Sequence, residues 1–239
     1  MNDVARRIIR SAERIVSFSG AGLSAESGVP TFRDPQTGGL WKDFDPTRLA
    51  SPQGFAADPD LVTEWYAWRR RTIAEAQPNP AHTALAARGD ITHVTQNVDD
   101  LLRRAGAQHV IELHGTIARD RCHAACGHEE AVDLADPPGL RACPACGDHL
   151  RPAVVWFGET LPAEAWEAAE RACVSCEAML VVGTSAAVYP AAGLIALCKS
   201  AGAKIIIVNT QPSEASDLAD VQLLGKAGEI VPELLQERH

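Results

Sequence analysis

A glycine-rich segment that follows the apolar residues 15–18 is the first candidate for ligand chemistry in this chain. It begins Gly20-Ala21-Gly22-Leu23-Ser24-Ala25, which fits the dinucleotide-binding pattern G-x-G-x-x-G/A. In that pattern the glycines allow a tight turn and a close backbone approach, and the amino terminus of the next helix holds a pyrophosphate. Glycine-rich turns also join strands to helices without any ligand. The segment therefore indicates either a phosphate site or a structural turn.

An amide, a carboxylate and an imidazole follow two further apolar runs. Asn97 and Asp99 come after residues 91–95, and His114 comes after residues 110–113. The carboxyl ends of parallel strands share one sheet edge, where open α/β sheets collect their ligands. A histidine there can act as a general base near neutral pH. The alternatives are a turn histidine and a helix cap formed by the amide and the carboxylate.

Small polar residues follow two more apolar runs in the same way. Gly183-Thr184-Ser185 comes after residues 179–182, and Asn209-Thr210-Gln211 comes after the run that begins at residue 204. Their hydroxyl and amide groups suit ribose hydroxyls and adenine edges, and they also suit ordinary turns. We expect them at the same sheet edge as the glycine-rich segment.

Four of the seven cysteines form two close pairs, Cys122-x3-Cys126 and Cys143-x2-Cys146, separated by residues 127–142. Two such pairs can surround a tetrahedral zinc ion, and four thiolates leave that ion no open position. The zinc would therefore stabilise the fold and take no part in catalysis.

Three other features keep the ligand set open. His123 and His128 lie close enough to replace Cys122 or Cys126 as ligands. A further pair, Cys173-x2-Cys176, competes for the metal, but it precedes a buried strand and is interpreted as core cysteines.

The elements that must position these residues alternate along the chain. We predict strands at residues 15–19, 91–95, 110–113, 153–157, 179–182, 204–209 and 221–224, and helices at 59–76, 80–88, 98–105, 162–175 and 190–201. Several strands are almost continuously apolar, as expected of strands buried on both faces. The alternation predicts an α/β fold with a Rossmann-like, doubly wound parallel sheet.

Two regions interrupt this alternation. Residues 30–80 contain no convincing strand, which counts against an ordinary nicotinamide dehydrogenase, and residues 117–151 replace the apolar periodicity with cysteine, histidine, proline and glycine. We therefore predict a Rossmann-like domain formed by residues 1–116 and 152–239, which includes a helical module at about 30–80. A small zinc-binding domain would occupy residues 117–151.

Composition and charge restrict the class of partner. The chain has 239 residues, 46% hydrophobic and 22% charged, with a net charge of −9. That charge argues against nucleic acid and anionic membranes as partners. Because the amino terminus lacks the apolar core of a secretory signal and no segment is long enough to span a bilayer, we expect a cytoplasmic protein. We also expect it to be a monomer.

Taken together, these segments resemble the sirtuins, the NAD-dependent protein-lysine deacylases. The matching segments run in the family's order from Gly20 to Asp34, then Thr95-Gln96-Asn97-Val98-Asp99, Leu113-His114-Gly115, the paired cysteines, Val154-Val155-Trp156-Phe157-Gly158-Glu159, Gly183-Thr184-Ser185 and Val208-Asn209. They cover nearly the whole chain. The region without strands then corresponds to the family's mobile cofactor-binding loop and helical module, and only the first cysteine pair is wider than the commonest spacing.

The resemblance implies a reaction that consumes NAD. The acyl-lysine carbonyl oxygen would attack the ribose carbon that bears nicotinamide, and a base would then deprotonate a ribose hydroxyl so that the acyl group moves to the sugar. The products would be free lysine, nicotinamide and O-acyl-ADP-ribose. The substrates would be acyl-lysine proteins or peptides.

The resemblance also assigns roles to residues. The NAD site would comprise Gly20, Ala21, Gly22, Thr31, Phe32, Arg33, Gln96, Asn97, Asp99, Gly183, Thr184, Ser185, Asn209, Gln211 and Ala227. The catalytic residues would be His114, as the general base, and Asn97. Val155, Phe157, Gly158 and Glu159 would pair with the substrate peptide by strand addition.

The predicted helix at 59–76 bears on the acyl group. Tyr66 and Arg69 are three residues apart, so they share a helix face on which a phenol and a guanidinium can grip a carboxylate. The alternative is a surface helix with its arginines in solvent. The pair resembles the sirtuin branch that removes succinyl, malonyl and glutaryl groups, so we expect a preference for acidic acyl groups with weaker deacetylation.

Three other functions remain possible from the sequence. A dehydrogenase would reduce NAD instead of releasing nicotinamide. An interaction module with a zinc ribbon would bind NAD without turnover and without dependence on His114. A mono-ADP-ribosyltransferase would use the same electrophile.

Overall fold

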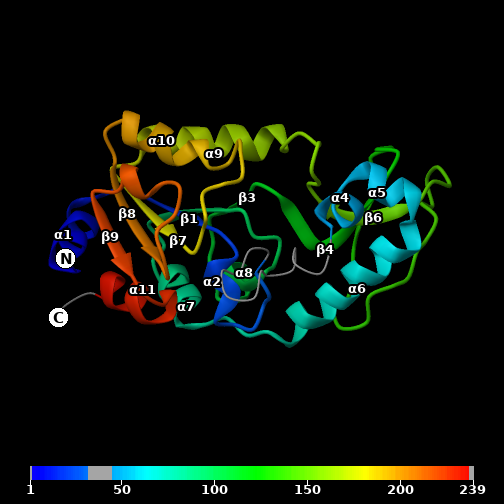
Figure 1. Cartoon of the computed structure of the whole chain (residues 1–239), viewed down its shortest axis with the longest axis horizontal. Helices are drawn as coiled ribbons and strands as arrows, with labels where there is room; N and C mark the ends of the chain where they lie inside the picture. The colour runs from blue at the N-terminus through cyan, green and yellow to red at the C-terminus, as the bar shows by residue number, and fades with distance from the viewer. Residues whose placement is uncertain (1, 32–44, 237–239) are drawn as a thin grey trace.

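The computed structural model describes residues 2–31 and 45–236 and contains one six-stranded parallel sheet (Figure 1). Its strands are β1 (Ile15–Ser19), β2 (Ile91–Thr95), β3 (Val110–Glu112), β7 (Ala178–Val182), β8 (Lys204–Asn209) and β9 (Val221–Leu224), in the order β3-β2-β1-β7-β8-β9. The chain thus builds one half of the sheet outward from β1 and the other half outward from β7. This is the Rossmann order, with the switch point between β1 and β7, and it confirms the predicted fold class.

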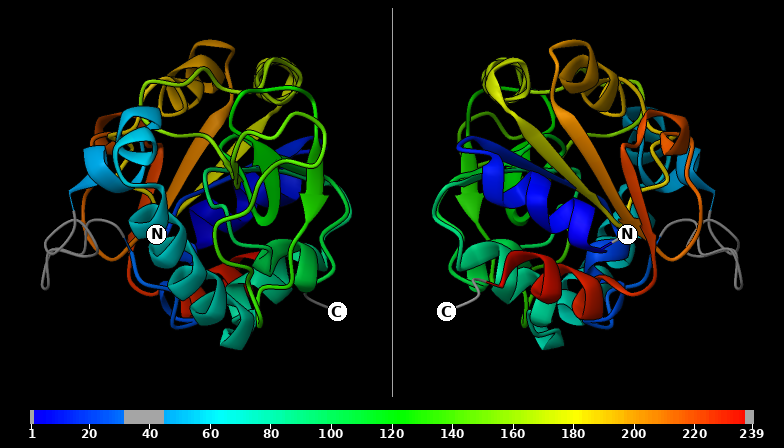
Figure 2. Two further views of the ribbon diagram at one scale, coloured as in Figure 1. Left: turned by 90° about the vertical axis from the view of Figure 1, so that its right-hand side faces the viewer. Right: turned by 90° about the vertical axis from the view of Figure 1, so that its left-hand side faces the viewer.

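Alternation along the buried strands creates two hydrophobic cores. In β7, Leu180 packs on one face of the sheet while Met179 and Val181 pack on the other. The first face is covered by α1 (Asn2–Ser11), α7 (Pro80–Ala86), α8 (Leu101–Arg104) and α11 (Ala227–Leu235), and the second by α9 (Ala163–Ser175) and α10 (Gly193–Ser200). Helices therefore cover both faces of the sheet (Figure 2).

A second, antiparallel sheet lies apart from the first. Its strands are β4 (Gly115–Cys122), β5 (Glu129–Ala131) and β6 (Leu150–Val154), in the order β5-β4-β6. The prediction of a strand at 153–157 in the parallel sheet was wrong, because the strand ends at Val154 and pairs with β4. The run at 153–157 is continuously apolar, and such a run alone does not distinguish a strand of this second sheet from a strand of the parallel sheet.

A helical module packs on this second sheet at the right of Figure 1. It consists of α4 (Pro46–Leu49), α5 (Pro52–Ala57) and α6 (Pro59–Glu75). Each helix has proline in its first turn, and the side chain of the preceding Asp45, Ser51 or Asp58 accepts a backbone hydrogen bond as the N-cap. Two short elements, α2 (Gly22–Ala25) and the 3-10 helix at Ser216–Leu218, complete the described chain.

None of the helices within 2–31 and 45–236 has both the length and the apolar character that crossing a bilayer requires.

Candidate active site

One cavity of about 1150 Å³ lies at the carboxyl edge of the parallel sheet. The strand register creates it, because Ser19 of β1 pairs with Thr95 of β2 and with Val182 of β7, so the residues after these strands meet at one level. The predicted NAD-site residues that line it are Gly20, Ala21, Gly22, Thr31, Gln96, Asn97, Gly183, Thr184, Ser185, Asn209, Gln211 and Ala227. Phe32 and Arg33 lie outside the described residues.

Two glycines are required where the turns after β1 and β7 touch. A Cβ on Gly22 would lie 2.7 Å from the Gly183 carbonyl oxygen, and Gly183 itself has a φ of +61°. The Gly22 amide also donates to that oxygen at 2.8 Å. The glycine-rich segment is therefore a structural turn and a wall of the cavity at once, so the two readings of its sequence do not exclude each other.

Three polar side chains connect the strand ends across the cavity floor. Gln96 Nε2 donates to Thr184 Oγ1 at 3.0 Å, and Asn209 Nδ2 donates to the Thr184 carbonyl oxygen at 3.0 Å. β2, β7 and β8 are thus fixed relative to one another at the level where a ligand would lie.

His114 lies beside this cavity with a defined tautomer. Its Nδ1 is 3.0 Å from the Gln96 carbonyl oxygen, and because a carbonyl can only accept, Nδ1 carries the proton of the neutral ring. Nε2 is then the basic nitrogen. Burial lowers the pKa of His114, and the hydrogen bond to Gln96 opposes that shift. At neutral pH the ring is therefore ready to accept a proton.

A buried network that the sequence did not indicate supports Asn97 and Asp99. Ser24 Oγ donates to Asp99 Oδ2 at 2.8 Å and accepts from Asn97 Nδ2 at 3.2 Å. Because His82 Nδ1 accepts from the Asn79 amide, its Nε2 carries the proton that faces Ser24 Oγ at 3.4 Å. The serine hydroxyl thereby uses its one donor and both acceptor positions.

The charges in this network follow from burial. Burial lowers the pKa of His82 to about 4, and it raises the pKa of Asp99 against the opposing hydrogen bond from Ser24. Neither Asp99 nor Ser24 is among the residues that line the cavity, but Ser24 connects Asp99 to Asn97, which does line it. The sequence contains a cap signal at Asn79-Pro80, but nothing in it indicates that the capped helix carries a histidine to Ser24.

The predicted substrate edge follows β6 and passes His114. The Val155 amide donates to the His114 carbonyl oxygen at 2.9 Å, and Phe157 is 44% exposed. Gly158 has a φ of +88°, which lets the chain turn there. Glu159 faces inward, where its carboxylate accepts from the Trp156 amide at 2.8 Å and from Arg121 and Arg151. Glu159 therefore holds the turn that presents Phe157.

Tyr66 and Arg69 both lie on the buried face of α6. Their exposed fractions are 1% and 7%, so the alternative of a helix with its arginines in solvent does not hold for Arg69. The Arg69 Cζ lies 4.9 Å from the Trp65 ring centroid and 5.5 Å from that of Tyr66. Burial lowers the pKa of Arg69, while the nearby Tyr66 and Asp99 raise it. The pair forms a buried cationic and phenolic surface.

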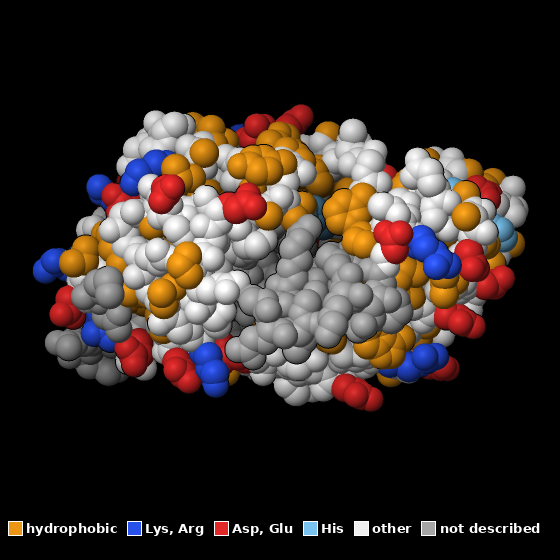
Figure 3. Space-filling model, viewed as in Figure 1, with side chains coloured by type: hydrophobic (Ala, Val, Ile, Leu, Met, Phe, Trp, Pro, Cys, Tyr) orange, Lys and Arg blue, Asp and Glu red, His pale blue; other side chains and the backbone are white. Residues whose placement is uncertain are grey.

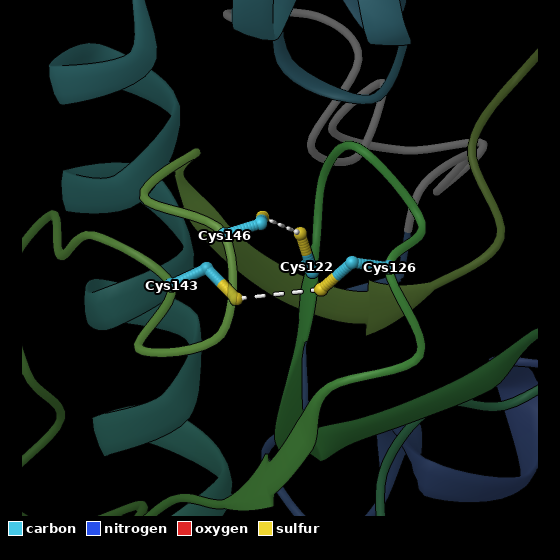
Figure 4. Close-up of side chains that lie close together, drawn as sticks. All are labelled: Cys122, Cys126, Cys143 and Cys146. Carbon is cyan, nitrogen blue, oxygen red and sulfur yellow. Dashed lines mark hydrogen bonds between the residues drawn. The ribbon is translucent and has the colours of Figure 1, made fainter.

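The four paired cysteines converge on one point (Figure 4). Cys122 Sγ lies 3.4 Å from Cys146 Sγ, Cys126 Sγ lies 3.6 Å from Cys143 Sγ, and all four sulfurs are within 4.8 Å of one another. Four thiolates at about 2.3 Å from a tetrahedral zinc ion would be about 3.8 Å apart, so the cluster fits zinc.

The rival metal ligands lie elsewhere. His128 Nε2 contacts Glu130 at 3.1 Å, and the ring of His123 packs 5.0 Å from that of Phe55. Cys173 and Cys176 are buried in the core beside α10, as the core interpretation predicts. Among the described residues, the four-cysteine group is the one cluster suited to a metal.

Acidic and basic side chains are both scattered over the described part of the face in Figure 3. Near the sheet edge, the cavity walls carry Glu26, Glu214 and Lys226.

The fold and this site define a Rossmann-type α/β protein with a cavity at the switch point and a four-cysteine cluster beside a second, smaller sheet. Comparison with known proteins identifies the family. A model described as "Sir2 family" matches residues 20–190. NAD-dependent protein deacylase 2 of Pyrobaculum aerophilum is 49% identical over 96% of this chain and 93% of its own length, and NAD-dependent protein deacylase 1 of Pseudomonas aeruginosa is 48% identical over 96% of each. The chain belongs to the Sir2 family.

Solved structures agree with this assignment. A Sir2 homologue in complex with NAD has a TM-score of 0.91 and 43% identity, covering 98% of this chain and 93% of the other. A Sir2 complex with a p53 peptide and NAD+ has a TM-score of 0.83 and 29% identity, covering 96% and 95%.

Proposed function

We propose that this chain is an NAD-dependent protein-lysine deacylase that prefers acyl groups carrying a carboxylate, such as succinyl and malonyl, and removes acetyl groups more slowly. The names of the relatives support the deacylase activity. The burial of Arg69 beside Tyr66 on the inner face of α6 is the observation that carries the acyl preference.

Different groups of residues have different roles in the proposed reaction. Bound NAD would supply an electrophilic ribose carbon. The reaction would consume acyl-lysine, NAD and one water molecule, and it would give nicotinamide, O-acyl-ADP-ribose and free lysine. The residues after β1, β2, β7 and β8 hold NAD over the sheet edge, and Asn97 borders the nicotinamide end. His114 Nε2 accepts the proton of a ribose hydroxyl, because Nδ1 is committed to Gln96. The main chain at Val155 to Glu159 pairs with the substrate peptide.

The cysteine cluster belongs to the same proposal. Cys122, Cys126, Cys143 and Cys146 would hold one zinc ion, which fastens β4 to the segment before β6. Four thiolates close the coordination sphere, so the metal serves the fold.

The acyl preference follows from the chemistry of the Arg69 guanidinium. An acyl carboxylate offers a negative charge and two acceptor oxygens, which match the planar donors of arginine, whereas an acetyl group offers neither. Such a charge-assisted contact contributes about 1.5 to 3 kcal/mol, or about ten- to a hundredfold in selectivity.

Peptides of one sequence that carry either succinyl-lysine or acetyl-lysine test this function. They are incubated with and without NAD, and the products are identified by mass spectrometry. Arg69→Met should lower the succinyl-to-acetyl ratio of kcat/KM by about ten- to a hundredfold. The matched control is Arg71→Met, which removes an exposed arginine from the same helix and should leave the ratio unchanged. An unchanged ratio in Arg69→Met contradicts the acyl preference.

The same incubation separates the other functions. Release of nicotinamide together with O-acyl-ADP-ribose supports a deacylase. Reduction of NAD would indicate a dehydrogenase, a covalently ADP-ribosylated peptide would indicate a transferase, and NAD binding without turnover would indicate an interaction module.

A further inference from the structure

We propose that Trp156 is a positioning residue that orients the Tyr66 hydroxyl toward the acyl carboxylate, and that it thereby helps to set acyl selectivity. The inference rests on the proposed function, in which Tyr66 and Arg69 bind that carboxylate. Its basis is a hydrogen bond between two buried side chains that come from distant parts of the sequence.

The indole of Trp156 contacts Tyr66 directly. Trp156 Nε1 lies 2.9 Å from the Tyr66 hydroxyl oxygen, and the two residues are 2% and 1% exposed. An indole N–H can only donate, so the tyrosine oxygen must accept. Arg69, the neighbouring cation, also has only donors. Neither neighbour can therefore receive the tyrosine's own proton.

This arrangement leaves the hydroxyl proton of Tyr66 to be donated to a ligand. Burial raises the pKa of Tyr66, so the hydroxyl keeps its proton at neutral pH. Within the described residues, the Tyr66 hydroxyl accepts from Trp156, and its ring also contacts Trp65 and Arg69. A carboxylate placed between the phenol and the guanidinium would accept from both, whereas a methyl group would accept from neither.

Trp156 is itself held from three sides, so the direction of its N–H is fixed before substrate arrives. Arg151 Cζ lies 3.9 Å from the indole ring centroid, in the geometry of a cation–π contact. The Trp156 amide donates to Glu159, whose carboxylate also accepts from Arg151. The ring of Phe55 packs against the indole, with the two ring centroids 5.4 Å apart.

The position of Trp156 in the chain gives the contact a second consequence. Trp156 lies between Val155 and Phe157 in the segment proposed to pair with the substrate peptide. The turn at 155–159 therefore pairs with the peptide backbone and also orients the phenol of Tyr66, which binds the acyl group. Recognition of the backbone and recognition of the acyl group thus depend on the same turn.

Three substitutions test the inference on peptides that carry succinyl-lysine or acetyl-lysine. Trp156→Phe keeps a ring beneath Arg151 and removes the N–H donor, and Tyr66→Phe removes its acceptor. Trp156→Phe should lower the succinyl-to-acetyl ratio of kcat/KM by about two- to tenfold, the effect of losing one neutral hydrogen bond. Combined with Tyr66→Phe, it should lower the ratio no further than Tyr66→Phe alone, because the two residues act through one hydroxyl. Trp166→Phe, a half-buried tryptophan of α9, is the control and should leave the ratio unchanged.

A second replacement removes any effect of ring size. Benzothienylalanine at position 156 keeps the bicyclic shape and replaces the N–H by sulfur, so it should lower the ratio as Trp156→Phe does. This variant decides the matter if the phenylalanine variant folds poorly.

The outcomes separate the two proposals. If Arg69→Met lowers the ratio and both replacements of Trp156 leave it unchanged, the role of Trp156 is wrong and the proposed function stands. If Trp156→Phe lowers the ratio equally in the Tyr66→Phe background, the tryptophan acts by packing and the inference is overturned. If Arg69→Met itself has no effect, the proposed acyl preference is wrong.

Discussion

The protonation state of His114 determines the pH range in which the proposed reaction can run. Burial lowers the pKa of this histidine below the ordinary value of 6.5. The neutral ring, which can accept a proton at Nε2, is therefore the main form at neutral pH and is lost as the pH falls through the lowered pKa.

We therefore expect an acidic limb in the pH profile that reports this group. With an acetyl-lysine peptide, whose acyl group does not titrate, kcat/KM should be constant around neutrality and fall with an apparent pKa below 6.5. His114→Ala should lower turnover by about a hundred- to ten-thousandfold, the usual contribution of a general base. Binding of ADP-ribose, measured by calorimetry, serves as the control for an intact cavity. Near-normal turnover in His114→Ala would rule out this base.

At the level of single residues, the sequence predicts groups that act from strand ends and misses those that act through other side chains. Asn97 and Gln96 were predicted because both follow a recognisable strand, and both line the cavity. Ser24 and His82 form one hydrogen-bonded pair, yet 58 positions separate them. Tyr66 and Trp156 are 90 positions apart. The first contact depends on how α2 packs against α7, and the second on how α6 packs against the turn after β6, which local periodicity does not encode.

At the level of elements, one buried ion pair joins α6 to β4. Arg70 Nη2 lies 2.6 Å from Asp120 Oδ1, with both side chains at most 6% exposed, and Arg70 Nε donates to the Ile117 carbonyl oxygen. Arg141 Nη2 contacts the other oxygen of Asp120 at 2.8 Å. The helix that carries Tyr66 and Arg69 is thus attached to the strand that begins beside His114.

Breaking this attachment should destabilise the protein strongly. Asp120→Asn leaves the guanidinium of Arg70 buried without its counter-charge, so the free energy of unfolding in urea should fall by about 3 to 5 kcal/mol. Glu129→Gln is the matched control, because it removes the ion pair between Glu129 of β5 and Arg119 of β4, whose side chains are 43 to 44% exposed. It should cost at most about 1 kcal/mol. Equal costs for the two substitutions would contradict the argument.

Most of the predicted strands agree with the observed ones in extent. The strands at 15–19, 91–95, 204–209 and 221–224 were predicted with their observed bounds, and the one at 179–182 begins one residue earlier, at Ala178. The helix expected at 98–105 forms only over Leu101–Arg104, since the residues before it are in the loop that holds Asp99 against Ser24. α1 and α11 were missed. α1 presents few apolar residues between its charges, and α11 has Pro232 in its interior.

At the scale of the whole molecule, the cavity and the cysteine cluster belong to different sheets. The residues that line the cavity come from three parts of the described chain, namely residues 20–31, Gln96 with Asn97, and residues 183–227. β4 connects the two regions, since it begins at Gly115 beside His114 and ends at the cluster residue Cys122. β6 lies next to β4 and leads directly into Val155. The sequence indicates both the cavity region and the cysteine cluster, but it does not indicate that β4 connects them.

Removing the metal should therefore separate ligand binding from turnover. A structural zinc ion contributes about 10 to 16 kcal/mol of folding free energy in small zinc domains, so its loss should unfold the segment between β4 and β6. The protein as purified should contain one zinc per chain. After treatment with a strong chelator, turnover of an acyl-lysine peptide should be lost. The peptide-pairing segment follows β6 and His114 precedes β4, so both lose their positions when these strands unfold. ADP-ribose, whose proposed cavity is lined by residues that follow the strands of the parallel sheet, should still bind in calorimetry, and added zinc should restore turnover.

The control is the same chelator saturated with zinc. Full turnover by the metal-free protein would contradict the structural role of the cluster, and loss of ADP-ribose binding together with turnover would contradict the independence of the two regions.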